Sequence, residues 1–332
     1  MKQQELLKTL AQLSQNQRKR LEIWLKDQFN LNEELKNTRP PVCPHCHKES
    51  RVIKKGILNN KQRYQCKECG KLFIYDSQTI TSYMKIKKDV FYEIVLDTLK
   101  GHSLKKTAAR LDLPVKTVFF NRHKFLCFLQ EYLDRENQSI SGTVEIDETF
   151  DLASEKGNRK IERKARKRGE PSNLRGISHE QVCIVTSTDR NGHEIFKAVG
   201  FGKPATKDIL LHFAKRISNK SVIYSYGSFC YNQLAEASES KLVNLKTHTS
   251  YNKGEHLNTV SYIHSLIKQM FAYYKSVATK YINRYLSLMV FLRRFADIDD
   301  NEKIPAMIGI SKWFKFRVTY EDTRCYQLFC NL

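Results

Sequence analysis

Two pairs of cysteines constrain the fold of this chain more than any other feature of its sequence. Cys43 and Cys46 form the first Cys-x-x-Cys pair, and Cys66 and Cys69 form the second. Two residues between thiolates allow a tight turn to aim both sulfur atoms at one tetrahedral ion, so the pairs predict a zinc ribbon within residues 39–80. Four free thiols are the alternative. Four thiolates leave no open coordination position, so the expected Zn²⁺ is structural.

The net charge of the chain indicates which kind of molecule it binds. Lysine and arginine outnumber aspartate and glutamate by 57 to 35, which gives a formal net charge of +22. A surplus of this size favours a polyanionic partner, with nucleic acid ahead of an anionic membrane surface, over a role in solubility alone. From the first residues of the sequence we expect no signal peptide, and no apolar run approaches the ~18 residues of a membrane span. We therefore expect a soluble intracellular protein that does not bind a membrane.

Residues 81–138 have the spacing of a helix-turn-helix. Ser103 can cap a first helix over residues 104–111, and Pro114 can open a second helix that begins at Val115. The polar side of this second helix is the side that would enter a major groove. It carries four residues that we expect to contact DNA: Lys116, Asn121, Arg122 and Lys124. An ordinary helical hairpin is the alternative, and the neighbouring zinc ribbon and the charge favour DNA.

A short strand over residues 143–150 carries several carboxylates. Val144 and Ile146 recur at period two, which is typical of a half-buried strand. Asp147 lies near the end of the strand, where a site can open beside a rigid sheet. Acidic side chains that simply stay in water at a strand edge are the alternative.

The elements expected after this strand define the fold class. Two more strands follow, and then a helix, a strand, a helix, a strand and a long helix from about residue 257. This order predicts a mixed α/β sheet over residues 139–300, and it is the order of a ribonuclease-H-like fold. A basic run over residues 156–168 is either a solvated loop or a contact for a phosphate backbone. Residues 1–38 are expected to form a helical segment and residues 301–332 a C-terminal tail.

On these motifs the chain resembles bacterial insertion-sequence transposases of the DDE class, of the ISXO type. In that family a zinc ribbon and a helix-turn-helix precede a ribonuclease-H-like catalytic domain. Besides the cysteine pairs, the markers are residues 144–149, Gly227-Ser228 after a strand, residues 256–260 at the start of a helix, and residues 280–286. The resemblance implies a DNA transposase that cuts element ends and joins them to target DNA. It also implies double-stranded DNA as partner, a homo-oligomer on that DNA, and a cytoplasmic, nucleoid-associated location.

The same resemblance implies two Mg²⁺ or Mn²⁺ ions held by three side chains. The first ligand matches Asp147. The second, an Asp in the family, falls at Tyr226, and the third, a Glu or Asn, falls at Ser261. A phenol with a pKa near 10 and a neutral hydroxyl do not replace the charge of carboxylates. Asp208 and Glu255 do not lie at matching positions. We therefore expect a transposase inactivated at two of its three metal ligands.

Three further residues in or near the late helix are candidates for the site. Lys268 matches a basic family residue that contacts DNA phosphate, and a solvated helical lysine is the alternative. His256 and His264 lie near the expected site, where we expect packed or capping histidines.

The competing functions are an active transposase, a catalytically dead DNA-binding protein derived from one, and a transcription factor with an unrelated sensor domain. The strand order and the resemblance argue against the last.

Overall fold

The computed structural model describes residues 43, 45–46, 51–58, 61–74, 79–82, 84–136, 138–158, 160–161, 164, 167, 170–245, 255–274, 276–313 and 318–324. The helical segment expected over residues 1–38 lies outside the described residues. Four arginines of the basic run also lie outside them: Arg159, Arg163, Arg166 and Arg168. Within the described part of the chain, no helix is long and apolar enough to cross a membrane.

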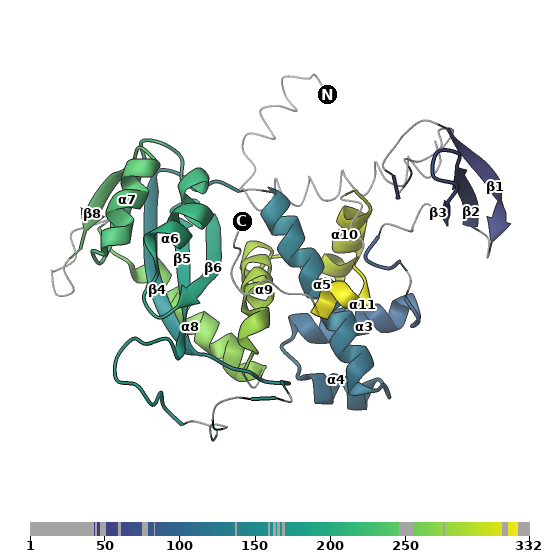
Figure 1. The fold of residues 1–332 in the computed structure, drawn as a ribbon, viewed down its shortest axis with the longest axis horizontal. Helices are drawn as coiled ribbons and strands as arrows, with labels where there is room; N and C mark the ends of the chain where they lie inside the picture. Colours follow the sequence, from purple (N-terminus) through teal and green to yellow (C-terminus); the bar gives the residue numbers. More distant parts are fainter. Residues whose placement is uncertain are drawn as a thin grey trace.

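A small three-stranded sheet carries the second pair of cysteines. Its strands are β1 (Val52–Leu58), β2 (Lys61–Cys66) and β3 (Leu72–Ile74), which pair antiparallel in the order β1-β2-β3. Tyr64 and Phe73 stack with ring centroids 5.8 Å apart. They pack with Val52 and the cysteines in a core that is separate from the main core of the protein. In Figure 1 this sheet lies at one end of the molecule.

Three helices follow: α3 (Lys88–Leu99), α4 (Leu104–Arg110) and α5 (Val115–Glu136). The expected cap is present, because Ser103 Oγ accepts a hydrogen bond from Lys106 N at 3.3 Å. Asp112, in the left-handed region with φ of 49°, turns the chain between α4 and α5. The predicted helix, turn and second helix are therefore confirmed as local structure.

The central sheet has five strands in the order β6-β5-β4-β7-β8. They are β4 (Thr143–Leu152), β5 (Gln181–Asp189), β6 (Glu194–Phe201), β7 (Val222–Ser225) and β8 (Lys241–Asn244). β4, β5 and β6 form an antiparallel meander, whereas β7 and β8 run parallel to β4. The sheet is therefore mixed, as the sequence predicts.

Helices cover both faces of this sheet. α6 (Thr206–Phe213), its extension η2 (Ala214–Arg216) and α7 (Phe229–Ala237) belong to one face; α8 (Asn258–Tyr273), η3 (Thr279–Tyr281) and α9 (Ile282–Arg294) belong to the other (Figure 1). Successive residues of β5 point alternately to the two layers of helices. Cys183 and Val185 pack with α6 and α7, whereas Val182 and Ile184 pack with α8 and α9. The predicted order of strands and helices is confirmed.

One hydrophobic core joins the helices before the sheet to the sheet itself. Phe91 of α3 and Phe128 of α5 belong to the same buried cluster as Ile263 of α8 and Leu286 of α9. The predicted C-terminal tail contributes to this core as well. Its helices α10 (Asp300–Trp313) and α11 (Tyr320–Arg324) contact α3 and α5, respectively. Helices α3 and α5 are thus packed against the α/β unit.

Candidate active site and metal centre

The four predicted zinc ligands lie together. The Sγ atoms of Cys43 and Cys69 are 3.6 Å apart, as are those of Cys46 and Cys66, and all four lie within 4.8 Å of one another. Sulfurs at about 2.3 Å from a tetrahedral zinc ion would be about 3.8 Å apart, so the arrangement fits such an ion. Hydrogen bonding by the backbone N–H of Cys69 lowers the pKa of the Cys66 thiol to about 7, which favours the thiolate that a metal needs.

Asp147 is the centre of the candidate active site. Its side chain is 20% exposed, on the face of β4 that α8 covers. Burial raises the pKa of this carboxyl to about 7, and the neighbouring charge of Glu148 adds to the effect. Glu148 itself points to the opposite face of the sheet, where its Oε2 accepts a hydrogen bond of 2.5 Å from Tyr231 Oη of α7. The two adjacent acids therefore do not share one site.

His264 is the nearest group to Asp147 on α8. Its Nδ1 lies 4.0 Å from Asp147 Oδ2, and its Nε2 lies 2.8 Å from Thr186 Oγ1 on β5. Burial, together with the charge of Lys268, lowers the pKa of His264 to about 4, so the imidazole is neutral at pH 7. Sequence reasoning treats His264 as a packed histidine, and the structure shows a packed histidine that also faces the candidate site. Its position one helical turn after Ser261 is the signal that places it there.

Glu145, two residues before Asp147, fixes the start of α8. Its carboxylate accepts hydrogen bonds from Thr259 N at 3.0 Å, Val260 N at 3.1 Å and Thr259 Oγ1 at 2.9 Å. Arg190, from the β5–β6 turn, forms an ion pair with it at 2.8 Å, and the side chain of Glu145 is only 2% exposed. A carboxylate at the positive end of a helix is favourable, so this strand residue performs the role of a helix cap. His256 Nδ1, 3.5 Å from Glu145 Oε1, belongs to the same cluster.

Tyr226 and Ser261 are the residues that the sequence predicts at the positions of the two other ligands. Tyr226 follows the end of β7 and is 45% exposed. In the parallel pairing of β4 with β7, Glu145 is opposite Tyr224, so the next position on the same face sets Asp147 beside Tyr226. Ser261 is exposed in the first turn of α8.

The residues around Asp147 do not fit two Mg²⁺ or Mn²⁺ ions. Such ions take several oxygen ligands, and carboxylates supply the charge that balances them. Near Asp147 lie the Thr186 hydroxyl and the neutral imidazole of His264, and the strand register sets the Tyr226 phenol beside it. Across the ranges that the structure describes, the only group of three or more His, Cys, Asp or Glu close enough to hold a metal is the cysteine quartet. The expectation of a depleted ligand set stays a prediction.

The structure corrects three of the four expected DNA contacts. Asn121, Arg122 and Lys124 are at most 3% exposed, so they do not present a surface to a groove. The Arg122 guanidinium donates to Thr98 and Thr107, the Lys124 ammonium donates to Ser82 O at 2.7 Å, and Asn121 Nδ2 donates to Thr117 O. The reason is that α3, α9 and α11 surround α5 and bury its polar side. Lys116, in the first turn of α5, remains exposed.

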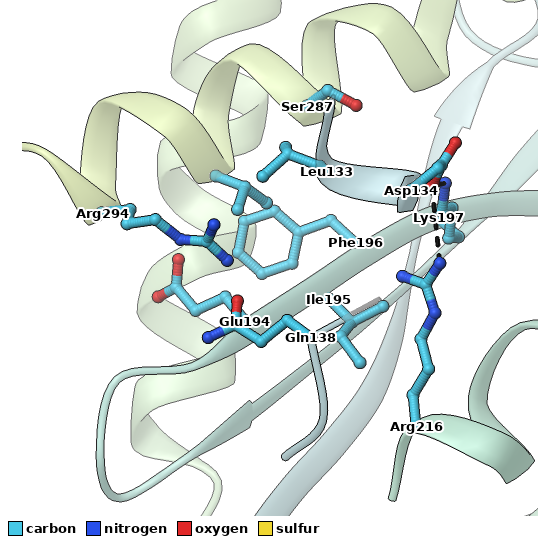
Figure 2. Close-up of a pocket in the computed structure, with 11 residues that line it drawn as sticks. Leu133, Asp134, Gln138, Glu194, Ile195, Phe196, Lys197, Arg216, Ser287 and Arg294 are labelled. Atoms are coloured by element: carbon cyan, nitrogen blue, oxygen red, sulfur yellow. Dashed lines mark hydrogen bonds and ion pairs between the residues drawn. The ribbon is translucent and has the colours of Figure 1, made fainter. Parts of the chain in front are cut away.

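A small charged pocket lies away from Asp147, between the end of α5, β6 and α9 (Figure 2). Asp134 accepts from Lys197 at 2.6 Å and lies 3.6 Å from Arg216. Glu194 pairs with Arg293 at 2.7 Å. These ion pairs join the end of α5, β6, η2 and α9 to one another.

Comparisons with known proteins find a transposase family and a protein of a transposable element. Residues 139–294 match the family described as the ISXO2-like transposase domain. An uncharacterized protein in transposable element ISH50 of Halobacterium salinarum is 27% identical over 269 residues, which cover 77% of this chain and 86% of that protein. A crystal structure of a pre-cleavage Mos1 transpososome aligns with 72% of this chain and 82% of its own at 12% identity. Its TM-score of 0.24 is too low to carry an argument.

The match over residues 139–294 and the relative in a transposable element support an insertion-sequence transposase of the DDE type. The similarity to the relative in ISH50 reaches into the region before residue 139, because it covers 77% of this chain, whereas residues 139–332 are only about 58% of it.

Proposed function

We propose that this protein is a transposase-derived DNA-binding protein that recognises the ends of an insertion sequence and does not cut them. The family supports DNA transposition as its origin. The strand order β6-β5-β4-β7-β8, with α8 against β4, is that of a ribonuclease-H-like domain, in which DDE transposases cleave and join DNA strands. The fold of that enzyme is retained, whereas its metal-holding side chains are not.

The observation that carries the proposal is the isolation of Asp147. Tyr226 and Ser261 stand at the two positions where the family has metal ligands, and neither supplies a negative charge at neutral pH. A neutral His264 faces Asp147 instead. A site with one carboxylate cannot balance the charge of two divalent cations.

DNA binding is assigned to the segments before the sheet. We propose a zinc ribbon over residues 39–80 that holds one structural Zn²⁺ by its four cysteines, and a helix-turn-helix over residues 81–138. On the latter, α4 and the start of α5 present exposed Lys105, Lys106 and Lys116. The ribonuclease-H-like domain spans residues 139–300. Family membership supports assembly as a homo-oligomer on double-stranded DNA, at the nucleoid in the cytoplasm.

Strand cleavage on duplexes that carry the terminal inverted repeat of the element tests this proposal. With Mg²⁺ or Mn²⁺, the unaltered protein should bind the duplex and leave both strands intact. The double variant Tyr226→Asp with Ser261→Glu restores two carboxylates and should acquire nicking activity. Adding Asp147→Asn to that variant should abolish the activity again, which is the matched control. Cleavage by the unaltered protein would show that it is an active transposase.

A further inference from the structure

The short helix α11 packs along one face of α5, the second helix of the proposed helix-turn-helix. In Figure 1, α11 lies against α5, and the two helices are in contact. The Tyr320 ring lies 5.4 Å from the Phe120 ring, and the Lys116 ammonium lies over the Tyr320 ring at 5.7 Å from its centre. The start of α11 therefore reaches the first turn of α5, where Lys116 is exposed.

Arg284 of α9 fastens the other end of α11. Its Nη1 donates a hydrogen bond of 2.8 Å to Thr323 O, and its Nη2 donates one of 3.3 Å to Asp322 O. The same Nη1 lies 3.2 Å from His123 Nδ1 on α5. Carbonyl oxygens near the C-terminal end of a helix have no partner within that helix, so a guanidinium that binds them holds the helix end in place.

Cys127 of α5 lies near the fastened end of α11. Lys116, Phe120 and Cys127 recur at spacings of four and seven residues, which places them on one face of the helix. We call these three residues the outer face of α5. Burial raises the pKa of the Cys127 thiol to about 11, and the negative charge of Asp322 on α11 adds to the rise. α11 therefore follows the outer face from Lys116 to the neighbourhood of Cys127.

α11 also brings acidic side chains to the outer face. Of its residues, Glu321 and Asp322 are acids and Arg324 is a base, in a chain whose net charge is +22. Both acids are exposed. Asp322 Oδ2 accepts hydrogen bonds of 2.7 Å from Thr319 N and Thr319 Oγ1, which hold this carboxylate at the start of the helix. Negative charge beside a recognition helix repels phosphates.

We propose that α11 is an autoinhibitory clasp, which covers the outer face of α5 in the free protein and leaves it when duplex DNA binds. This inference rests on the proposed function, because it assigns a control on DNA binding by the helix-turn-helix. The N-terminal residues of a recognition helix contact base edges. Lys116 is such a residue, and α11 holds its ammonium at Tyr320. DNA that binds Lys116 therefore displaces Tyr320 and approaches the acids next to it.

Opening of the clasp and binding of DNA are then coupled in both directions. A change that weakens the packing of α11 on α5 raises the affinity for duplex DNA, and duplex DNA raises the fraction of the protein in which α11 is open. Cys127 reports this opening directly. A thiol reacts as its thiolate, and both the access to Cys127 and its acidity increase when α11 leaves.

Reaction of Cys127 with iodoacetamide measures the opening in the full-length, zinc-loaded protein, with mass spectrometry of the Cys127 peptide as readout. Tyr320→Ala removes the ring contacts to α5, and we expect it to speed the reaction several-fold. Leu211→Ala, at an apolar residue of α6 that is 43% exposed, is the matched control and should react like the unaltered protein. Cys183, buried in β5, should react slowly in every form, which separates opening from unfolding.

A duplex with the terminal inverted repeat of the element completes the test. Saturating duplex should speed the reaction of Cys127 several-fold in the unaltered protein. Tyr320→Ala should bind the duplex about two- to fivefold more tightly, a gain of the size of one exposed cation–π contact. Glu321→Gln should also bind more tightly at low salt, with a gain that shrinks as the salt concentration rises. Glu236→Gln, at an exposed acid of α7, is its matched control and should change the affinity little.

Two results overturn the clasp and differ in what they say of the proposed function. If the duplex binds, leaves the Cys127 reaction unchanged or slower, and binds no more tightly to Tyr320→Ala, the clasp is wrong and the proposed function stands. If no form of the protein binds the duplex, the proposed function fails and the clasp fails with it. If a fast reaction of Cys183 shows that Tyr320→Ala is unfolded, the unaltered protein with duplex and the Glu321→Gln variant decide between the same results.

Discussion

Asp147 is held in an environment that favours its protonated form. Burial raises its pKa from the ordinary 3.8 to about 7, and the closest group across the site, His264, is neutral and brings no compensating positive charge. In an active two-metal site the cations would favour the carboxylate. In this chain the ionised acid is instead a source of instability, which a substitution can reveal.

Asp147→Asn should therefore stabilise the protein above neutral pH. A raised pKa in the folded state contributes stability that is present below about pH 4 and is lost as the pH rises through about 7. An Asn side chain does not ionise, so the variant does not lose stability as the pH rises. Its free energy of unfolding should exceed that of the unaltered protein by about 2–4 kcal/mol at pH 8, with little difference at pH 4. Urea unfolding at both pH values measures this. An equal difference at the two values would contradict the raised pKa.

At the scale of elements, the attachment of α8 to β4 positions the whole site. Glu145 contributes one buried carboxylate that satisfies two backbone N–H groups of α8 and pairs with Arg190. The sequence shows Glu145 beside Asp147 but does not distinguish the two acids, because both lie on the same face of the strand. Only the packing of α8 shows that one acid caps a helix and the other faces the site.

Glu145→Ala should destabilise the protein strongly. The variant leaves two buried N–H groups of α8 without their acceptor and removes the partner of Arg190, so we expect a loss of about 2–4 kcal/mol in the free energy of unfolding. Glu145→Gln keeps an acceptor and should lose less. Urea unfolding provides the measurement, with Glu236→Ala, an exposed residue of α7, as control. A loss within about 0.5 kcal/mol, typical of surface positions, would show that the cap does not hold α8.

The burial of the polar side of α5 is a feature that the sequence does not predict. The order of strands and helices follows from hydrophobic periodicity, and the bounds of α4 and the start of α5 follow from Ser103 and Pro114. Periodicity identifies a polar side on a helix but not what covers it. Arg122 and Lys124 are polar and yet buried, because hydroxyl and carbonyl groups of Thr98, Thr107 and Ser82 satisfy them inside the protein.

At the scale of the whole molecule, the protein has two cores of different size. The core beside the sheet β1-β2-β3 contains few buried residues beyond the cysteines, whereas the main core runs from α3 through the central sheet to α10. The sequence predicts the ribbon from ligand spacing alone, and the four sulfur atoms do lie together. It does not show that the segments on either side of residue 139 share one core, because shared burial depends on contacts between residues far apart in the chain.

Removal of zinc should therefore unfold one part of the protein and spare the other. We expect about one Zn²⁺ per chain in the purified protein and none in Cys43→Ser. The removal of one thiolate leaves an incomplete set of ligands for the tetrahedral ion. The main thermal transition should be unchanged in that variant, since its core contains none of the four cysteines. Metal analysis and calorimetry measure both quantities. Cys183→Ser, at a buried cysteine outside the quartet, should keep its zinc. Zinc retained by Cys43→Ser would contradict the assigned ligands.

Binding of Mn²⁺ at the Asp147 position tests the central claim most directly, because it does not depend on finding a DNA substrate. Electron paramagnetic resonance counts the ions bound by the zinc-loaded protein. In the unaltered chain no bound Mn²⁺ should depend on Asp147. The Asp147→Asn variant should therefore bind as many ions as the unaltered chain. The variant Tyr226→Asp with Ser261→Glu should bind Mn²⁺ in a manner that Asp147→Asn abolishes, because three carboxylates then face one site. Tight, Asp147-dependent binding of Mn²⁺ by the unaltered chain would show that its metal centre is intact.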